Sequence, residues 1–302
     1  MSSAQMETLL EELEDDNVQE DFALHLVSNF LRLALLIIGS MLVPSFIFMS
    51  YILLYFVPNF LEAPTFLSLF TDGRALINLL VMPIMLVGCF LLYLFFMGLI
   101  TRILWKFSEK KSPSQDGVIP RNLPSKTLDY YHYRSFCIKH PKNVFTKGMF
   151  PWLANWFYNF VGTSEIGKGS TIEEQVCADK FIEVGENCYI GVNSTLTSHF
   201  VEGIFGNITY FKVKVGDNVT LAGLNGITPG CEIGDNSYLL PLASAAKHSI
   251  IKGNNYYFGI PLRKIFKRKL MRYLDIEMED LEKSDKIRKK QQLKKNMKEG
   301  AK

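Results

Sequence analysis

A six-residue period in the second half of the chain is the feature that most restricts its fold. Mostly aliphatic residues recur at every sixth position from Ile166 to Leu196, and the same spacing resumes from Val215 to Ile251. The fifth residue of each hexapeptide is mostly small, and glycine often stands second. A helix has a period of about 3.6 and a half-buried strand a period of about 2, so neither produces this pattern.

The period is expected of a chain that coils into a triangular prism. Each hexapeptide supplies one flat side and one corner, so three hexapeptides, or eighteen residues, complete one coil. The first residue fills the interior, and the fifth points inward where only a small group fits. We therefore predict a mainly β fold: a parallel β-helix over residues 166–261, with a loop excursion over residues 202–214.

The cysteines fit this interpretation without any chemical role. Cys188 and Cys231 occupy the fifth position of their hexapeptides, where a small buried side chain is expected. Cys89 lies in an apolar run, and Cys137 and Cys177 belong to no cluster. Five cysteines without close pairs argue against a secreted disulfide scaffold.

Two long apolar runs precede the repeat. The runs 33–57 and 75–101 contain no charged residue, and about 20 apolar residues are enough to cross a bilayer. They explain why 48% of the residues are hydrophobic and why the mean hydropathy is +0.10. We predict two transmembrane helices, at about 31–57 and 75–104, within a membrane segment over residues 29–107.

Basic residues set the expected orientation of these helices. Arg102, Lys106, Lys110 and Lys111 follow the second run, whereas the loop between the runs carries only Arg74. The positive-inside rule then places the end of the second helix in the cytoplasm. We predict an integral membrane protein with two spans, with both termini and the β-helix in the cytoplasm and with membrane lipids as partners.

Four further segments complete the predicted organisation. Residues 1–28 form an acidic amphipathic segment, and residues 108–127 form a polar linker. Residues 128–165 are aromatic and basic, which suits a membrane-proximal cap, a cap over the end of the β-helix, or both. Residues 262–302 form a basic helix or tail that could meet anionic lipid head groups, meet the acidic N-terminal segment, or stay solvated.

Residues 166–265 resemble the hexapeptide-repeat acyltransferases. Ile190-Gly191-Val192-Asn193-Ser194-Thr195 matches their repeat, [LIV]-G-x-x-[small]-x, and Gly259 to Ile265 resembles their closing G-x-P-A-K-x-I, with Leu262 and Arg263 in place of Ala and Lys. The resemblance implies a left-handed parallel β-helix and a homotrimer with active sites between subunits. It implies no permanently bound cofactor, and as cosubstrate an acyl-CoA or acyl-carrier thioester that lies along the coils.

A narrower resemblance covers more of the chain. Two spans, an aromatic-basic segment and then Phe160-Val161-Gly162-x-x-x-Ile166-Gly167 resemble one unit of the C-terminal membrane half of poly-lysine synthetase-type peptide synthetases. Those proteins carry three tandem β-helix domains and six spans, as a homotrimer of this chain would. The chain shows no adenylation or carrier domain, so the resemblance implies a donor activated elsewhere, such as a carrier protein.

His199 is the candidate catalytic base. It is the fourth residue of the last hexapeptide before the excursion, so it is expected to face outward beside a long loop, and such loops often carry function. The unperturbed pKa of histidine, about 6.5, suits proton transfer near neutral pH. In the acyltransferases that the chain resembles, a histidine in such a place takes the acceptor's proton. Glu202 is the candidate for orienting its imidazole.

The candidate donor contacts are less specific. Ala222, Gly223 and Gly226 follow the excursion and could lie along a pantetheine arm. Arg263 and Lys264 could meet the phosphates of coenzyme A, or they could simply begin the basic tail.

The remaining histidines receive other interpretations. His248 also stands fourth in its hexapeptide, but it lies nearer the C-terminal end and is interpreted as a structural or rim residue away from the excursion. His132 is a candidate second site residue at the membrane face. A zinc site needs three convergent ligands, and the repeat contains only His199 and His248, so no metal is expected. The basic tail lacks interleaved aromatics, so no nucleic acid is expected either.

The sequence therefore favours a membrane-bound acyltransferase. It would move an acyl or aminoacyl group from a thioester to an amine or hydroxyl at the cytoplasmic face. The alternative is a non-catalytic trimeric β-helix that serves as a scaffold for membrane partners. A channel is disfavoured because the only charges at the spans are Arg32 and Arg102, at their edges.

Overall fold

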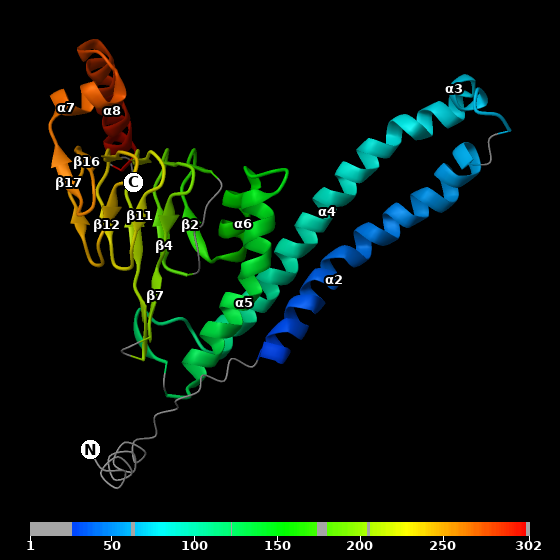
Figure 1. Cartoon of the computed structure of the whole chain (residues 1–302), viewed down its shortest axis with the longest axis horizontal. Coiled ribbons are helices and arrows are strands. Elements are labelled where there is room, and N and C mark those ends of the chain that lie inside the picture. Colours follow the sequence, from blue (N-terminus) through cyan, green and yellow to red (C-terminus); the bar gives the residue numbers. More distant parts are fainter. Residues whose placement is uncertain (1–25, 62–63, 122, 174–179, 204–205, 300–302) are drawn as a thin grey trace, which may run out of the picture. The chain divides into compact units, whose positions relative to one another are not determined.

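The computed structural model describes residues 26–61, 64–121, 123–173, 180–203 and 206–299 (Figure 1). Nearly all of the predicted acidic segment 1–28, and also Cys177, lie outside these ranges. The chain divides into two compact units. The first comprises Met1–Met149, Trp156–Gly162 and Glu202–Ile208, and the second comprises Phe150–Asn155, Thr163–Val201 and Thr209–Lys302.

Two long apolar helices dominate the first unit. α2 (Leu26–Tyr51) continues into the π-helical segment η1 (Ile52–Leu61), and α3 (Ser68–Thr71) leads into α4 (Gly73–Lys111). Figure 1 shows α2 and α4 side by side, and the hydroxyl of Tyr51 donates to the carbonyl of Asn78 at 2.6 Å. The stretches Val27–Phe60 and Gly73–Lys111 are both long and apolar enough to cross a membrane.

The C-terminal half of α4 is built differently from its N-terminal half. At about 1.5 Å per residue this helix of 39 residues is far longer than a bilayer core of about 30 Å. Beyond its apolar half, buried side chains recur every three or four positions, which is the stripe of a helix packed on protein. The stripe consists of Leu94, Met97, Gly98, Thr101, Trp105 and Ser108.

An aromatic layer covers this stripe. It comes from α5 (Lys126–Lys147), whose first turn is capped by the Ser125 hydroxyl, and from α6 (Leu153–Val161). The rings of Phe145 and Phe157 stack at 4.3 Å. A Cβ at Gly98 would lie 3.2 Å from the Trp156 ring, so Gly98 allows that ring to approach α4 closely. Within the first unit, the aromatic segment therefore packs on the end of α4.

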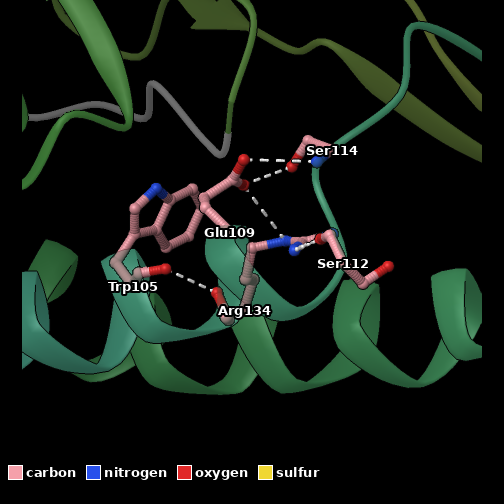
Figure 2. Close-up of polar contacts among 6 residues, drawn as sticks. Trp105, Glu109, Ser112, Ser114 and Arg134 are labelled. Carbon is pink, nitrogen blue, oxygen red and sulfur yellow. Dashed lines mark hydrogen bonds and ion pairs between the residues drawn. The ribbon is translucent and has the colours of Figure 1, made fainter.

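A buried arginine joins the end of α4 to α5 (Figure 2). Arg134 of α5 is only 3% exposed, and its guanidinium donates to the carbonyl of Ser112, the C-terminal cap of α4, at 2.7 Å. The same guanidinium lies 3.6 Å from the Glu109 carboxylate, which also accepts from the hydroxyl and N–H of Ser114. These contacts fix the point where the chain leaves α4.

The second unit contains three walls of parallel strands. One wall has the order β15-β12-β9-β4-β2, another β17-β16-β13-β10-β5-β3, and the third β14-β11-β6, with only β17 antiparallel to its neighbour. The strands are β2 (Ser164–Ile166), β3 (Thr171–Ile172), β4 (Ile182–Val184), β5 (Tyr189–Ile190), β6 (Thr195–Leu196), β9 (Val213–Val215), β10 (Thr220–Leu221), β11 (Gly226–Ile227), β12 (Glu232–Ile233), β13 (Tyr238–Leu239), β14 (Ser244–Ala245), β15 (Ile250–Ile251), β16 (Tyr256–Phe258) and β17 (Arg263–Ile265).

The strand register has the predicted period. Thr220 pairs with Tyr238, and Tyr238 pairs with Tyr256, so each coil takes eighteen residues. Across the excursion Tyr189 pairs with Thr220, which adds the thirteen extra residues to one coil. Every described first-position residue is at most 7% exposed, as expected of the interior. Three parallel walls with this register form a β-helix.

Asn225 is a fifth-position residue that is polar and not small. Asn225 is buried, and its Oδ1 accepts from the N–H of Gly223 at 2.9 Å. Its Nδ2 donates to the carbonyls of Leu240 and Ala243, at 2.7 and 3.0 Å, in the next coil. The amide is tolerated inside because its donors and acceptor are satisfied.

The excursion is a hairpin. β7 (His199–Glu202) pairs with β8 (Asn207–Tyr210), and within the first unit the N–H of Arg121, next to β1 (Gly117–Pro120), donates to the carbonyl of Gly206 at 2.6 Å. The chain therefore leaves the wall as early as His199, three residues before the predicted start of the loop.

The C-terminal segment folds back on the β-helix. α7 (Lys267–Leu274) and α8 (Met278–Glu299) contribute Leu270 and Leu281 to a core cluster with Leu240 and Tyr256 of the coils. The start of the basic tail is thus a packed amphipathic element, and Lys267 forms an ion pair with Asp285.

Candidate active site

The backbone of His199 is fixed where the chain leaves the wall. The Thr197 hydroxyl donates to the carbonyl of His199 at 2.9 Å and accepts from its N–H at 3.4 Å. The N–H of this same Thr197, two residues before His199, still donates to the carbonyl of Ile227 in the wall at 3.0 Å. A single threonine therefore links the last wall position to the candidate base.

The neck of the hairpin is closed just below His199. The N–H of Phe211 donates to the carbonyl of Ser198 at 2.8 Å, and the N–H of Val213 then donates to the carbonyl of Phe181 at 2.8 Å as the chain rejoins the wall. Between them, the Lys212 ammonium forms an ion pair with the Glu183 carboxylate. His199 thus stands on a hairpin whose two ends are both held.

The imidazole of His199 lies in an aromatic setting. It is half-buried, and its ring meets the buried Tyr210 ring edge to face, with centroids 6.2 Å apart. Tyr210 in turn meets Phe181 at 4.9 Å. Edge-to-face pairs of this kind favour one ring orientation. A half-buried imidazole held in this way can exchange protons with a bound acceptor.

His248 lies at the same corner as His199. β6, β11 and β14 pair in register, so positions 199, 230 and 248 are equivalent in three successive coils. The ring of His248 also meets that of Phe211, at the neck of the hairpin, with centroids 4.6 Å apart. The prediction that His248 lies away from the excursion is therefore wrong. The error arose because thirteen inserted residues hide the equivalence along the sequence.

The predicted donor contacts do not gather in one place within the chain. Gly226 belongs to β11, in the same wall as β6, and Ala222 and Gly223 form the corner before it. Arg263 and Lys264 are exposed on β17, the edge strand of a different wall. Sequence reasoning also missed Tyr210 and Phe211. Their signal was the presence of two large aromatic residues at the end of an insertion.

The other candidate residues lie in the first unit. Glu202 ends β7, and it is grouped there with the tip of the hairpin. His132 lies on α5, where burial and then the charge of Arg121 lower its pKa, although Asp129 opposes this. Burial also lowers the pKa of His140 on the same helix. Both imidazoles are therefore held toward the neutral form.

No metal centre is apparent in the parts of the chain that the structure describes. Those residues contain no group of three histidine, cysteine, aspartate or glutamate side chains able to hold a metal ion. The described cysteines are free thiols, and Cys188 and Cys231 are buried in the coils as predicted. Burial raises the pKa of the Cys188 thiol, so it is held as the neutral thiol.

No protein-family model matches the sequence, but a relative does. Over 123 residues the chain is 28% identical to "Putative acetyltransferase YvoF" of Bacillus subtilis strain 168. The alignment covers 39% of this chain and 69% of YvoF.

Solved structures that match part of the chain include two acetyltransferases. The hexapeptide-repeat acetyltransferase VCA0836 of Vibrio cholerae O1 biovar eltor, complexed with acetyl coenzyme A, matches with a TM-score of 0.36 and 15% identity, over 41% of this chain and 81% of its own. A galactoside acetyltransferase in complex with coenzyme A matches with a TM-score of 0.29 and 27% identity, over 35% and 56%. The YvoF alignment therefore relates part of this chain to a putative acetyltransferase, and the β-helix of this chain has coils of eighteen residues.

Proposed function

We propose that the protein is a membrane-bound acyltransferase of the hexapeptide-repeat type. It moves an acyl or aminoacyl group from a thioester, coenzyme A or a carrier protein, to an amine or hydroxyl at the cytoplasmic face. The observation that carries this proposal is the position of His199. It is a half-buried imidazole at the neck of the hairpin that interrupts the β-helix, in a chain homologous to acetyltransferases.

His199 acts as the general base in this proposal. One imidazole nitrogen takes the proton of the acceptor's hydroxyl or amine as the acceptor oxygen or nitrogen attacks the thioester carbonyl carbon. The tetrahedral intermediate collapses, the carbon–sulfur bond breaks, and the imidazolium returns the proton to the departing thiolate. The products are an ester or amide and a free thiol, and the base is regenerated.

The donor and the assembly are further parts of the proposal. The β-helix is left-handed, and the protein is a homotrimer. Neighbouring subunits complete the cleft, because the residues that could contact the donor are not gathered around His199 within one chain. Ala222, Gly223 and Gly226 offer a narrow path for a pantetheine arm, and Arg263 and Lys264 offer charge to its phosphates. No cofactor is bound permanently, since the thioester arrives and leaves in each turnover.

The membrane position is supported by the apolar helices. Few residues are buried in the most apolar stretch of each helix, as expected of lipid-facing helices. Arg102, Lys106, Lys110 and Lys111 lie toward the C-terminal end of α4. Two spans would hold the β-helix next to the cytoplasmic face, where an acceptor embedded in the membrane could reach it. The poly-lysine synthetase-type relationship and a carrier-protein donor belong to the same proposal.

Thiol release by the detergent-solubilised full chain is the direct test. A panel of acyl-CoA donors is combined with amine and hydroxyl acceptors, and His199→Ala is measured beside the wild type. We expect acceptor-dependent release that His199→Ala lowers by about 10²- to 10⁴-fold, the usual contribution of a general base. His140→Gln, which alters a histidine on α5, is the matched control and should retain activity. Glu202→Gln tests the orienting role and should lower kcat less than His199→Ala does.

The size of each variant is measured alongside activity. Wild type and His199→Ala should both elute as trimers, so that loss of activity is not loss of assembly. If His199→Ala retains full activity, His199 is not the base. If no donor of either kind, coenzyme A or carrier-bound, gives release, the scaffold function replaces the enzyme.

A further inference from the structure

His248 has an unusual place among the corners of the β-helix. Its backbone is left-handed, with φ of 58°, a conformation that is unfavourable for most residues with a Cβ. Five other corners solve this problem with asparagine, all with φ between 54° and 57°: Asn187, Asn193, Asn218, Asn236 and Asn254. Asparagine would therefore serve the backbone at position 248 as well, so the imidazole itself calls for an explanation.

A slot on the preceding coil receives the His248 ring. A Cβ added at Gly230 would lie 2.3 Å from Nδ1 of His248, so the ring occupies the space that a side chain at 230 would fill. The N–H of His248 donates to the carbonyl of Pro229 at 3.1 Å, and the thiol of Cys231 donates to the carbonyl of Ala246 at 3.0 Å. The corner that presents His248 is therefore firmly tied to the coil below.

The exposed side of this corner meets the hairpin. The centroids of the His248 and Phe211 rings lie 4.6 Å apart, with an interplanar angle of 68°. The Lys247 ammonium lies 6.0 Å from the centre of the Phe211 ring. Both are geometries in which an aromatic face attracts its neighbour. Phe211 is thus held by two consecutive residues of one corner.

Phe211 connects this contact to His199. Its N–H donates to the carbonyl of Ser198, the residue immediately before His199. The path from the rigid corner to the candidate base therefore runs through one aromatic contact and one backbone hydrogen bond.

We propose that His248 is a positioning residue, which acts through Phe211 to fix the neck of the hairpin that carries His199. The inference rests on the proposed function of His199, and it assigns His248 no contact with substrate. A base on a loosened neck would still allow the donor to bind, but it would meet the acceptor's proton less often in the right geometry. Misplacement by about 1 Å can slow a reaction by about 10²-fold.

Two single variants remove the contact from opposite sides. His248→Asn keeps a residue suited to the left-handed backbone and deletes the ring, and Phe211→Leu keeps a large apolar side chain and deletes the aromatic face. Each should lower kcat by about tenfold to a hundredfold, with KM for the thioester within about twofold. Because both remove the same contact, the double variant should be no slower than the slower single variant.

Two controls separate this contact from general damage. Phe211→Tyr retains the ring and should keep kcat close to that of the wild type. Leu242→Asn makes the same kind of change at another corner, where Leu242 is exposed with φ of 64°, and it should leave kcat unchanged.

Hydrogen exchange gives a second measurement that does not depend on activity. Amides of β7 and β8 in the full-length, detergent-solubilised chain should exchange at least about tenfold faster in His248→Asn and in Phe211→Leu, and not in the two controls. The strands of the walls, such as β12 and β13, should exchange as in the wild type.

The outcomes separate this inference from the proposed function. If His199→Ala abolishes transfer while His248→Asn changes neither kcat nor exchange, the enzyme stands and the positioning role falls. An effect on KM alone, or additive losses in the double variant, also overturns it. If the wild type shows no transfer, the proposed function fails, and faster exchange of β7 and β8 alone decides whether His248 anchors the hairpin.

Discussion

Burial decides what the histidines of α5 can do. His132 and His140 are both partly buried, and burial lowers the pKa of each imidazole. For His132 the positive charge of Arg121 lowers the pKa further, because it disfavours a second cation nearby. Both side chains are therefore suited to remain neutral in the folded state near pH 7.

The stability of the first unit should fall when the solution is made acidic. The folded-state pKa of His132 is below the unfolded value of about 6.5, so the unfolded chain binds more protons between these two pH values. The contribution is complete above about pH 6.5 and is lost as pH falls below it. The midpoint of thermal unfolding should therefore drop between about pH 7.5 and about pH 5.5.

His132→Gln should reduce that slope, because glutamine does not titrate. Changing His140 to glutamine as well should reduce it again, since its pKa is shifted in the same direction. An unchanged slope in the double variant would show that other groups control the acid response.

The end of α4 shows how a whole element depends on one buried charge. Arg134 satisfies the carbonyl of Ser112 and lies beside the Glu109 carboxylate, so its removal leaves the helix end without this donor and the carboxylate without this cation (Figure 2). Removing one partner of a buried charged contact usually destabilises a protein by several kcal/mol.

Arg134→Ala should lower the local free energy of unfolding of α5 by about 2–4 kcal/mol. Hydrogen exchange of α5 amides in the detergent-solubilised chain measures this value. Lys110→Ala removes an exposed cation one residue after Glu109 and should change it by less than about 0.5 kcal/mol. Equal effects of the two variants would mean that net charge, and not the buried contact, stabilises this helix end.

The two units of the molecule differ in where their apolar side chains lie. The apolar helices of the first unit expose large side chains such as Phe46 and Ile84, whereas the coils of the second unit bury the first residue of every described hexapeptide. Exposed apolar area on this scale is typical of a membrane interaction, and it is the physical basis for proposing that the chain is anchored.

The proposed topology predicts that three natural sequons stay bare. Asn193, Asn207 and Asn218 each begin an N-x-S/T sequence in the β-helix or its hairpin. If that part faces the cytoplasm, translation into microsomes should add no glycan to any of them. A sequon-bearing insert between Pro64 and Thr65, in the loop between the spans, should be glycosylated and serves as the control. Glycan on any of the three natural sites would reverse the proposed orientation.

The sequence determined the architecture because its period is a direct record of the coil. Residues six apart face the same interior and residues eighteen apart pair, so the wall register could be predicted from Ile166 to Ile251. The two apolar helices could also be predicted from the sequence, because a helix long enough to cross a membrane needs an unbroken apolar run. His199 was found as a candidate because it stands at the one break in the period.

The tertiary structure alone decided which residues stand beside His199. The Phe211 ring contacts the ring of His248, thirty-seven residues later in the sequence, and the Tyr210 ring contacts that of His199, eleven residues earlier. Both contacts depend on the path of the hairpin, which the six-residue period does not predict. The packing of α7 and α8 on the coils was hidden for a similar reason, since a basic amphipathic helix suits lipid, solvent or protein equally well from composition. Repetition fixes contacts between equivalent positions, whereas contacts made by an insertion depend on where the folded wall brings its ends.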